Sequence, residues 1–456
     1  MDEVRVQQWP AGVDVTVEIV ARDLCIGCGV CTLACSRSYL TMLEGRGGAL
    51  IPVLANGPCA VQCGGCLSVC PFWPGNANED EIARQRFGTL THTDGIGFHA
   101  RVLAGHSASP SERLEGASGG IGSWMARAIL ETGFAEALVV AGTDSGGKDG
   151  YRDVRSVEEV SQCSSSRYTP LSVAEPLKRV ADARERAVVY AVPCVAKGLR
   201  LLCARVPKYR RAVTAIVGLT CGHNKRPDFW RFLAERHGLD ACHSRVVSYR
   251  VKRQGRASSD FGIRLEGLGA DGDTRTVTLG LCDDVASFWA HKWFAMNPCL
   301  YCDDLMAECA DVAIMDAWLP RFESDWRGTT IVVERHRLLD ELAQGRNDAP
   351  VCESLEPEDV LLSQAAALAW KREGLAQRIA GSDIWDRDAT GWKRLPEQLS
   401  SRLSSQLRWR LDARIAVLTG ALEVPLSTPQ RFLVSILTAG VAVADKALSV
   451  LRRLGV

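Results

Sequence analysis

An excess of charge of either sign is missing from this sequence of 456 residues, in which 54 Lys and Arg balance 54 Asp and Glu. A general nucleic-acid binder normally has a basic excess, and the aromatic residues that would stack on bases make up only 7% of the chain. We therefore expect no nucleic-acid partner. The shares of hydrophobic residues (46%) and charged residues (24%) are ordinary for globular proteins and exclude collagen, coiled coils and disordered chains.

Long apolar runs and an export signal are missing as well. The first 23 residues show no basic start followed by an apolar stretch, so we expect a cytoplasmic protein whose thiols stay reduced. The longest apolar run, residues 432–444, is shorter than the roughly 20 residues that cross a bilayer, which predicts no transmembrane segment. Its helical spacing favours a helix that packs inside the protein or in a homo-oligomer. Attachment to a membrane surface through this face and Arg452–Arg453 is the alternative.

Cysteine, in contrast, is abundant, with 18 residues. Clustered cysteines in a reducing compartment indicate metal ligands rather than disulfides. Eight of them form two runs, which are Cys25, Cys28, Cys31 and Cys35, then Cys59, Cys63, Cys66 and Cys70. The first run has the spacing of bacterial ferredoxins, in which three thiolates bind one iron–sulfur cluster and the fourth binds a second cluster.

The ferredoxin pattern predicts two 4Fe–4S clusters with crossed ligands. One cluster would be bound by Cys25, Cys28, Cys31 and Cys70, and the other by Cys35, Cys59, Cys63 and Cys66. Two tetrahedral zinc sites are the alternative, although zinc ribbons rarely crowd eight cysteines in this way. The sequence departs from the usual pattern in the gap of three residues after Cys59 and in Ser36, where proline is usual.

The middle of the chain has the pattern of an α/β domain. Short apolar runs at residues 137–142, 187–194 and 212–221 predict buried strands, and amphipathic stretches between them predict helices. Residues 262–267 and 274–280 alternate like an antiparallel pair. We expect an α/β fold with α+β elements in three parts: a ferredoxin-like 2×4Fe–4S domain (1–80), a central core (81–335) and a helical C-terminal extension (336–456).

Four further cysteines are candidates for a third cluster. Cys194 and Cys221 come at the carboxyl ends of adjacent predicted strands, where a parallel sheet would bring them together. Cys299 and Cys302 form a Cys-x-x-Cys pair. A zinc site and inert core thiols are the alternatives for this set.

Four segments, in order, resemble the coenzyme F-420 hydrogenase/dehydrogenase beta-subunit family. They are SGGIGSWMARAILETGFAEALVVAG, YAVPCVAKGLR, VGLTCGH and PCLYCDDLMAECADVAIMDAW, and they span roughly residues 80–335. The resemblance implies an FAD-binding α/β core whose own 4Fe–4S cluster lies next to the flavin. It also implies that Cys194, Cys221, Cys299 and Cys302 bind that cluster.

The flavin site is predicted less directly. Ser118, Gly119 and Gly120 open a predicted helix, where free backbone N–H groups favour phosphate, although a plain helix cap is the alternative. Donors that suit the flavin, in a stretch that the resemblance also assigns to it, are Ser164, Ser165, Ser166, Arg167 and Tyr168. Lys197 and His223 are candidate catalytic residues. The alternatives are that Lys197 is an ordinary surface lysine and that His223 has a structural role.

Together these features predict an iron–sulfur flavoprotein oxidoreductase with three 4Fe–4S clusters and FAD. Electrons would pass from a ferredoxin or another redox protein through the clusters to the flavin. The flavin would deliver them as hydride to a small conjugated acceptor, either F-420 or another organic metabolite. The alternative is a non-catalytic electron-transfer subunit of a larger redox complex.

Overall fold

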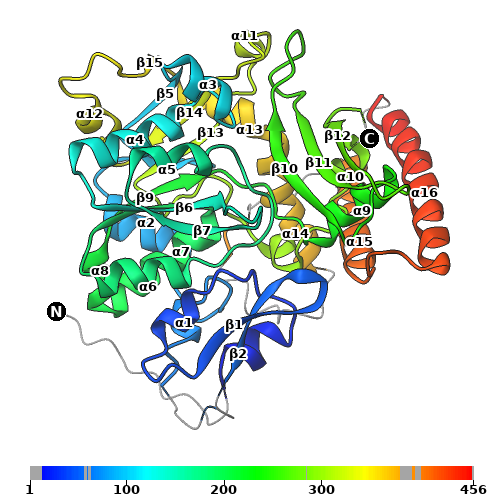
Figure 1. The fold of residues 1–456 in the computed structure, drawn as a ribbon, viewed down its shortest axis with the longest axis horizontal. Helices are drawn as coiled ribbons and strands as arrows, with labels where there is room; N and C mark the ends of the chain where they lie inside the picture. The colour runs from blue at the N-terminus through cyan, green and yellow to red at the C-terminus, as the bar shows by residue number, and fades with distance from the viewer. Residues whose placement is uncertain are drawn as a thin grey trace.

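The structure is a computed structural model that describes residues 13–55, 59, 63–283, 285–380, 393–395 and 402–453. An eight-stranded mixed sheet forms its centre (Figure 1). Its strand order is β15 (Val351–Ser354), β5 (Arg101–His106), β14 (Thr330–Glu334), β13 (Val312–Asp316), β9 (Val213–Leu219), β8 (Ala187–Ala191), β6 (Ala137–Thr143) and β7 (Asp149–Val154).

Four adjacent strands, β13, β9, β8 and β6, run parallel. Every residue of β8 is buried, as expected for a parallel strand covered on both faces. Alternate residues face two different apolar clusters, since Val189 belongs to the cluster of Leu199 and Val188 to that of Ile121. The helices of the first cluster are α6 (Ala174–Asp182), α7 (Pro193–Arg205) and α8 (Pro207–Ala212), and those of the second are α4 (Ile121–Thr132), α5 (Val157–Val160) and α12 (Leu338–Ala343).

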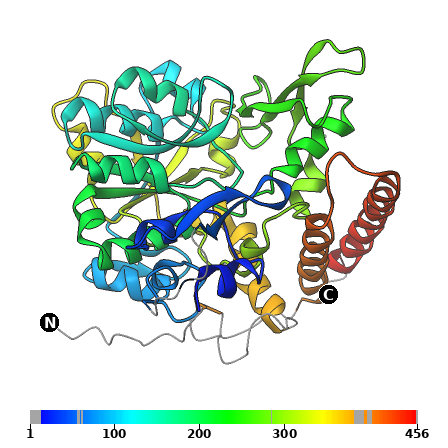
Figure 2. The ribbon, with the colours of Figure 1, turned by 60° about the horizontal axis from the view of Figure 1, so that its bottom comes forward.

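The cysteine-rich N-terminal segment packs against α7, as Figure 2 shows from below. It contains α1 (Val30–Ala34), an antiparallel hairpin of β1 (Leu40–Glu44) and β2 (Leu50–Leu54), and the 3₁₀ turn η3 (Leu67–Val69). A Cβ on Gly198 of α7 would lie only 3.3 Å from Val30 Cγ2 and 3.5 Å from Val69 O. The backbone N–H of Val173 also donates to Cys28 O at 3.0 Å. The segment therefore shares a continuous apolar core with the central domain.

Three short elements join this segment to the sheet and its surroundings: α2 (Glu79–Phe87), β3 (Thr91–Thr93) and β4 (Gly97–His99). Asn78 begins α2 with a capping box, because its side chain accepts from the Glu81 backbone N–H and the Glu81 carboxylate accepts from the Asn78 backbone N–H. Two further short helices, α3 (Pro110–Glu115) and α11 (Pro320–Glu323), lie near the edge of the sheet that β15 forms (Figure 1).

A third apolar cluster lies beside the central sheet and contains many aromatic rings, among them Phe229, Phe288 and Trp293. It is built on an antiparallel sheet of β10 (Ser244–Val251), β11 (Gly262–Leu268) and β12 (Thr274–Gly280), with α9 (Asp228–Arg236) and α10 (Ala286–Ala290). The predicted antiparallel pair is thus present as β11 and β12, and β10 adds a strand that the sequence reading missed.

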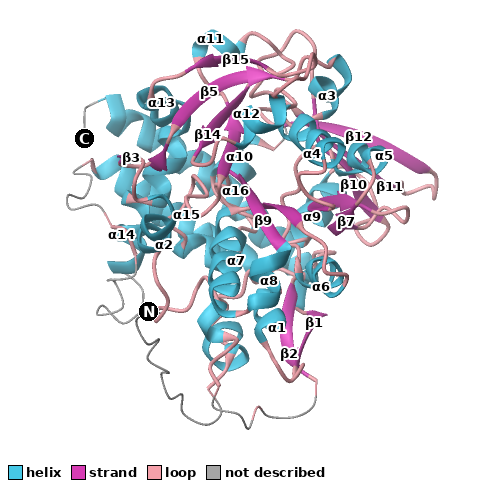
Figure 3. Cartoon of the chain, turned by 90° about the vertical axis from the view of Figure 1, so that its left-hand side faces the viewer, coloured by secondary structure: helices cyan, strands magenta, loops and turns pink. Residues whose placement is uncertain are grey.

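The chain after residue 335 is not wholly helical, in contrast to expectation. β15 pairs with β5 at the edge of the central sheet (Figure 3), and only then do the helices follow. These helices are α13 (Pro357–Lys371), α14 (Glu373–Ala380), α15 (Leu403–Gly420) and α16 (Thr428–Arg453). Trp370 and Leu375 lie in the same apolar cluster as the N-terminal segment. The α/β class is confirmed, whereas packing crosses both proposed domain boundaries, and the division into three parts stays a prediction.

Helix α16 bears on the expected absence of a transmembrane segment. Among the described residues it is the one helix long and apolar enough to cross a membrane by length and composition. It has 26 residues, a mean hydropathy of 1.7 in its most apolar window, and 17% of that window buried. A single helix of this kind is weak evidence for a span.

Candidate functional site

Cys25, Cys28, Cys31 and Cys70 come together where the N-terminal segment meets α7. Burial raises the pKa of Cys31 well above its usual range, and the adjacent thiols of Cys28, Cys25 and Cys70 raise it further. Burial also raises the pKa of Cys70 well above its usual range, and the thiols of Cys28 and Cys25 raise it further. These shifts favour the neutral thiol form, and a cationic group among the four sulfurs would be needed to favour the thiolate form.

Backbone N–H groups point at these sulfurs. The N–H of Gly27 donates to Cys25 Sγ at 3.4 Å. Burial raises the pKa values of Cys28 and Cys70, while hydrogen bonds from the N–H groups of Val30 and Phe72, respectively, lower them. Donors of this kind stabilise the thiolate form that binds iron.

The turn that presents these amides depends on glycine. Gly27 and Gly29 have φ values of 74° and 76°, a left-handed conformation that other residues rarely adopt. A Cβ on Gly29 would also lie 2.1 Å from Ser172 Oγ, so the turn closes directly onto the central domain.

The second predicted set is only partly described. Burial raises the pKa of Cys66 to about 11, and Cys63 is among its neighbours. A Cβ on Gly65 would lie 3.7 Å from Cys63 Sγ and 3.2 Å from Ala34 O, which is next in the chain to Cys35. Cys59 is described, but residues 60–62, which connect it to Cys63, lie outside the described residues.

The four core cysteines meet at the carboxyl ends of parallel strands, as their positions in the sequence suggested. Cys194 follows β8 in the first turn of α7, Cys221 follows β9, and Cys299 and Cys302 come from the 3₁₀ turn η5 (Asn297–Tyr301) and the residue after it. Burial raises the pKa of Cys194 well above its usual range, and Cys302, Cys221 and Cys299 raise it further. The N–H of Asn224 donates to Cys299 Sγ at 3.3 Å.

Within the described part of the chain, no group of three or more His, Cys, Asp or Glu side chains has the arrangement of a single metal-ion site. Five cysteines stand apart from any metal-binding pattern in the sequence, which predicts buried thiols. Of these, Cys163 is buried, Cys203 is intermediate, and Cys242, Cys282 and Cys352 are exposed. That expectation was wrong for the exposed three, because burial depends on tertiary packing that local sequence does not specify.

Lys371, which the sequence reading missed, lies among the core thiols. It is the last residue of α13 and is buried. Burial lowers the pKa of its ammonium, but Cys302, Cys221 and Cys299 outweigh this and raise it, with a hydrogen bond to Cys302. A lone lysine after an apolar helix has no motif, so no signal in the sequence assigned it to this site.

The N-terminal and core groups of thiols are adjacent. Cys28, from the first group, is among the neighbours that raise the pKa of Cys194 in the second. The Tyr151 hydroxyl lies beside both, since burial raises its pKa and Cys194, Cys28 and Cys221 raise it further. This hydroxyl donates to the Tyr190 carbonyl at 2.9 Å. The elements that carry the two groups also pack together, since α7, which contains Cys194, contacts α1 and η3 of the N-terminal segment.

The predicted phosphate-binding turn is tightly packed. Ser118 Oγ donates to Thr329 O at 2.6 Å. A Cβ on Gly119 would lie 2.6 Å from Gly105 O, and Gly120 has a φ of 81° at the start of α4. These residues hold the beginning of α4 against the edge of the central sheet, and their role toward phosphate stays a prediction.

The predicted flavin-binding stretch, residues 164–168, forms a loop organised by Arg167. This guanidinium donates to three carbonyls of its own loop, those of Ser164, Ser165 and Ser166, and to Asp149 Oδ1 at 3.0 Å. Arg167 therefore shapes the loop. Ser165 has a φ of 72°, and its buried hydroxyl has no hydrogen-bond partner within the described residues.

The two predicted catalytic residues occupy different surroundings. Lys197 of α7 is fully buried and pairs with Glu79 at 3.3 Å. His223 is buried near Trp289 and Trp370, and its Nε2 finds no partner among the described atoms. Burial lowers the pKa of His223 well below its usual range, and Lys225 lowers it further, so the ring stays neutral. A catalytic role for either residue stays a prediction.

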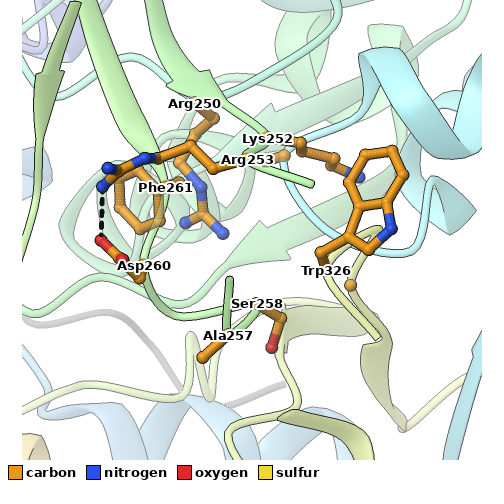
Figure 4. A pocket seen from close by; sticks show the side chains of 10 residues that line it. Arg250, Lys252, Arg253, Ala257, Ser258, Asp260, Phe261 and Trp326 are labelled. Carbon is orange, nitrogen blue, oxygen red and sulfur yellow. Dashed lines mark hydrogen bonds and ion pairs between the residues drawn. The ribbon is translucent and has the colours of Figure 1, made fainter. Parts of the chain in front are cut away.

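A small pocket, with room for about one water molecule, opens between β10 and the loop after α11 (Figure 4). Its lining includes the basic side chains of Arg250, Lys252 and Arg253 and the ring of Trp326. Arg250 donates to Asp316 at 2.6 Å, and burial lowers the pKa of Lys252 to about 7. The end of β10 thus places three basic side chains at the pocket, of which Arg250 pairs with Asp316 at the end of β13 and Arg253 pairs with Asp260.

Aromatic side chains connect this pocket with the VGLTCGH segment. Arg250 Nη1 donates to the Tyr168 hydroxyl at 3.2 Å. Tyr168 packs edge-on against Trp289 with ring centroids 5.0 Å apart, and Trp289 lies 5.3 Å from the His223 ring. The structure thus brings Tyr168 and His223, two of the predicted site residues, to the same region.

An α/β core with thiols grouped at the carboxyl edge of a parallel sheet defines a domain of the redox class. The chain belongs to the coenzyme F420 hydrogenase/dehydrogenase beta subunit family. The model of the family's N-terminal part matches residues 102–178 and that of its C-terminal part matches residues 184–360, together more than half of the chain. The predicted resemblance is confirmed, and membership indicates a role in redox electron transfer.

Two individual proteins are similar to this chain. The coenzyme F420-dependent sulfite reductase of Methanocaldococcus jannaschii is 24% identical over 255 residues, which cover 52% of this chain and 36% of that protein. The chain thus matches little more than a third of the length of this relative. A chain of the F420-reducing [NiFe] hydrogenase complex from Methanosarcina barkeri aligns with a TM-score of 0.47 and 15% identity, covering 64% of this chain and 97% of that chain.

Proposed function

We propose that this protein is an iron–sulfur flavoprotein oxidoreductase of the cytoplasm. Electrons from a ferredoxin-type donor pass through three 4Fe–4S clusters to FAD and leave as hydride to a small conjugated acceptor, either F420 or another organic metabolite. The observation that carries this proposal is the packing of α7, whose first turn contains Cys194, against α1 and η3 of the cysteine-rich segment, because it joins the ferredoxin-like thiols to the core thiols.

The thiols fit 4Fe–4S clusters in chemistry and surroundings. Cys25, Cys28, Cys31 and Cys70 would hold one cluster, Cys35, Cys59, Cys63 and Cys66 a second, and Cys194, Cys221, Cys299 and Cys302 a third. Each cluster supplies a site that takes up and releases one electron. The amides of Gly27 and Asn224 stabilise thiolates by donating to Cys25 and Cys299.

The region around residues 164–168 and the VGLTCGH segment fits a flavin. The buried polar atoms Ser165 Oγ, Thr220 Oγ1 and His223 Nε2 have no hydrogen-bond partner within the described residues. Buried polar groups are nearly always hydrogen-bonded, so these atoms suit a ligand with donors and acceptors along its edge. FAD supplies the conversion between one-electron and two-electron transfer.

The chain's own residues would orient the acceptor and exclude water. Arg250, fixed between Asp316 and Tyr168, and Lys252 would attract an acceptor that carries negative charge. His223, held neutral by burial, would hydrogen-bond without contributing charge. For Lys197 to face the flavin it must leave its ion pair with Glu79.

The acceptor is tested by titration under argon. Photoreduced protein should transfer hydride to F420, so that the F420 absorbance falls as the oxidised flavin spectrum returns. If F420 absorbance stays constant while the flavin remains reduced, F420 is not the acceptor. Reoxidation only by a second redox protein, and by no small acceptor, would favour the electron-transfer subunit instead.

The route through the core cluster is tested with Cys302→Ala, compared with Cys242→Ala at an exposed cysteine outside the three predicted ligand sets. Reduction of the flavin by ferredoxin should slow greatly in the first variant and not in the second. Reduction by a direct hydride donor should survive in both. Equal loss of both activities in Cys302→Ala would mean that the site is only structural.

A further inference from the structure

The hairpin of α15 and α16 exposes most of the large apolar side chains on the described surface. Nine of the sixteen exposed large hydrophobic residues belong to these two helices: Leu403, Leu407, Val417, Leu418, Phe432, Leu433, Ile436, Val443 and Val450. The hairpin lies at the edge of the molecule, with α16 outermost (Figures 1 and 2). An exposed apolar concentration of this kind marks a docking surface.

On α16 the exposed apolar residues form one continuous face. Phe432, Ile436, Val443 and Val450 are 68%, 52%, 68% and 55% exposed. They stand four and then seven residues apart, a spacing that places them on the same side of a helix. The opposite side packs inward through Val434, Val441 and Leu448. The helix therefore has two apolar faces, one packed against the protein and the other directed away from it.

The same hairpin is strongly basic in a chain whose formal charge is zero. Residues 402–453 contain eight Lys and Arg but only three Asp and Glu, a net charge of five positive units. Two of the three acidic residues, the buried Asp412 and the partly exposed Asp445, flank His291 at 2.9 Å each. Exposed cations at the C-terminal end of α16 are Lys446, Arg452 and Arg453.

Polar contacts hold α16 against the body of the protein. Arg408 of α15 reaches Asp445 at 3.3 Å, and Arg431 near the start of α16 pairs with Glu235 of α9 at 2.6 Å. A helix that crossed a bilayer would have to break these pairs and expose the buried His291. The contacts therefore favour a helix that stays docked and lies along a surface.

We propose that the α15–α16 hairpin docks this protein onto an anionic lipid surface, with the face of Phe432, Ile436, Val443 and Val450 buried at the headgroup boundary. Apolar residues along one face, flanked by Lys and Arg, are the pattern of helices that lie in the membrane interface. A second copy of the chain is disfavoured, because a two-fold contact would bring the same basic surface against itself.

The test uses the full-length protein, purified without oxygen, and co-sedimentation with vesicles. The vesicles consist of phosphatidylcholine alone or of equal parts phosphatidylcholine and phosphatidylglycerol. We expect binding to the anionic vesicles, weakened by high salt, and little binding to phosphatidylcholine alone. A triple variant, Phe432→Gln, Ile436→Gln and Val443→Gln, should bind at least about tenfold more weakly, because it removes apolar area from the interface.

Matched variants separate the contributions of basic and apolar residues to vesicle binding. A triple variant, Lys446→Gln, Arg452→Gln and Arg453→Gln, should also bind the anionic vesicles at least about tenfold more weakly, because each cation near an anionic surface adds to the binding. A double variant, Val247→Gln and Leu362→Gln, changes exposed apolar residues outside the hairpin and should leave vesicle binding unchanged. Absence of binding to anionic vesicles, or a dimer in sedimentation velocity that the triple apolar variant dissociates, would overturn the proposal. Protein that carbonate cannot extract from the vesicles would overturn it as well, because that result requires a spanning helix.

Discussion

The ammonium of Lys371 is the residue-scale feature with the clearest consequence for electron transfer. It is buried beside Cys302, Cys221 and Cys299, where its charge would offset that of a reduced cluster. Lys371→Gln should therefore lower the reduction potential of the core cluster by about 60 mV, a tenfold change in a one-electron equilibrium. The potential is measured by a redox titration followed by electron paramagnetic resonance.

Lys371→Arg retains the charge and should keep most of the potential, which separates electrostatics from loss of packing. A Lys371→Gln protein whose core potential equals that of the wild type would contradict the assigned role. This experiment also reports on the cluster without any assay of activity.

His223 makes stability depend on pH. Its pKa in the folded protein lies well below the ordinary value near 6.5, because burial and then Lys225 disfavour the charged ring. Below pH 6.5 the unfolded chain takes up a proton that the folded chain does not, so stability is lost as the pH falls. The loss should reach about 1.4 kcal/mol per pH unit from this residue.

The measurement is the thermal unfolding temperature between pH 7 and pH 5 under anaerobic conditions. His223→Gln should flatten the decline, whereas His92→Gln, at a more exposed histidine, should not. Parallel curves for His223→Gln and the wild type would show that the ring is not held neutral by its surroundings.

Residue by residue, the cysteines could be predicted from the sequence because a metal cluster requires ligands at fixed short spacings. The environment of other side chains could not. The flavin-site prediction for residues 164–168 stays a prediction, because whether Arg167 faces a ligand or its own loop depends on tertiary contacts with Asp149. Lys371 carries no local signal at all, since its role depends on where α13 ends.

At the scale of elements, Asp311 joins three parts of the fold. Its buried carboxylate accepts from Arg86 of α2 at 2.8 Å, from Arg200 of α7 at 2.7 Å and from the Ile216 N–H of β9 at 2.7 Å. Burial raises the pKa of this carboxyl, but Arg200 and Arg86 outweigh it and keep the pKa below its ordinary value. Asp311 thereby fixes α7, which carries Cys194, against the sheet.

Asp311→Asn should destabilise the protein by about 3–5 kcal/mol, the usual cost of removing one member of a buried ion pair. The free energy of unfolding is measured by denaturant titration. Asp182→Asn, at an exposed carboxylate, should change it by less than about 1 kcal/mol. Similar small effects of both substitutions would contradict the role assigned to Asp311.

Strands could be predicted from the sequence where their own residues form an apolar run, and not where only a distant pairing partner defines them. β6, β8 and β9 are short apolar runs whose burial on both faces is visible in the sequence. β15, with the sequence VCES, has every residue exposed and exists because β5 offers it an edge to pair with. The packing of α14 against η5 likewise arises from contacts between parts of the chain that are far apart in sequence.

At the scale of the whole molecule, the two groups of thiols lie on elements that pack together, since α7, which contains Cys194, contacts α1 and η3 of the N-terminal segment. The grouping explains why the ferredoxin-like segment shares its apolar core with the central domain instead of being joined to it by a free linker. Electron transfer between the two groups requires a fixed short separation, and shared packing provides it. Docking of the α15–α16 hairpin on a lipid surface would leave this arrangement intact, because the hairpin packs beside the third apolar cluster.

The most direct test is the iron, zinc and flavin content of protein purified without oxygen. Three clusters of four irons predict about twelve irons per chain, together with one FAD and no stoichiometric zinc. Cys302→Ala should retain about eight irons, because only the core cluster loses a ligand. Zinc in place of iron, or a wild-type chain with neither flavin nor a core cluster, would contradict the account.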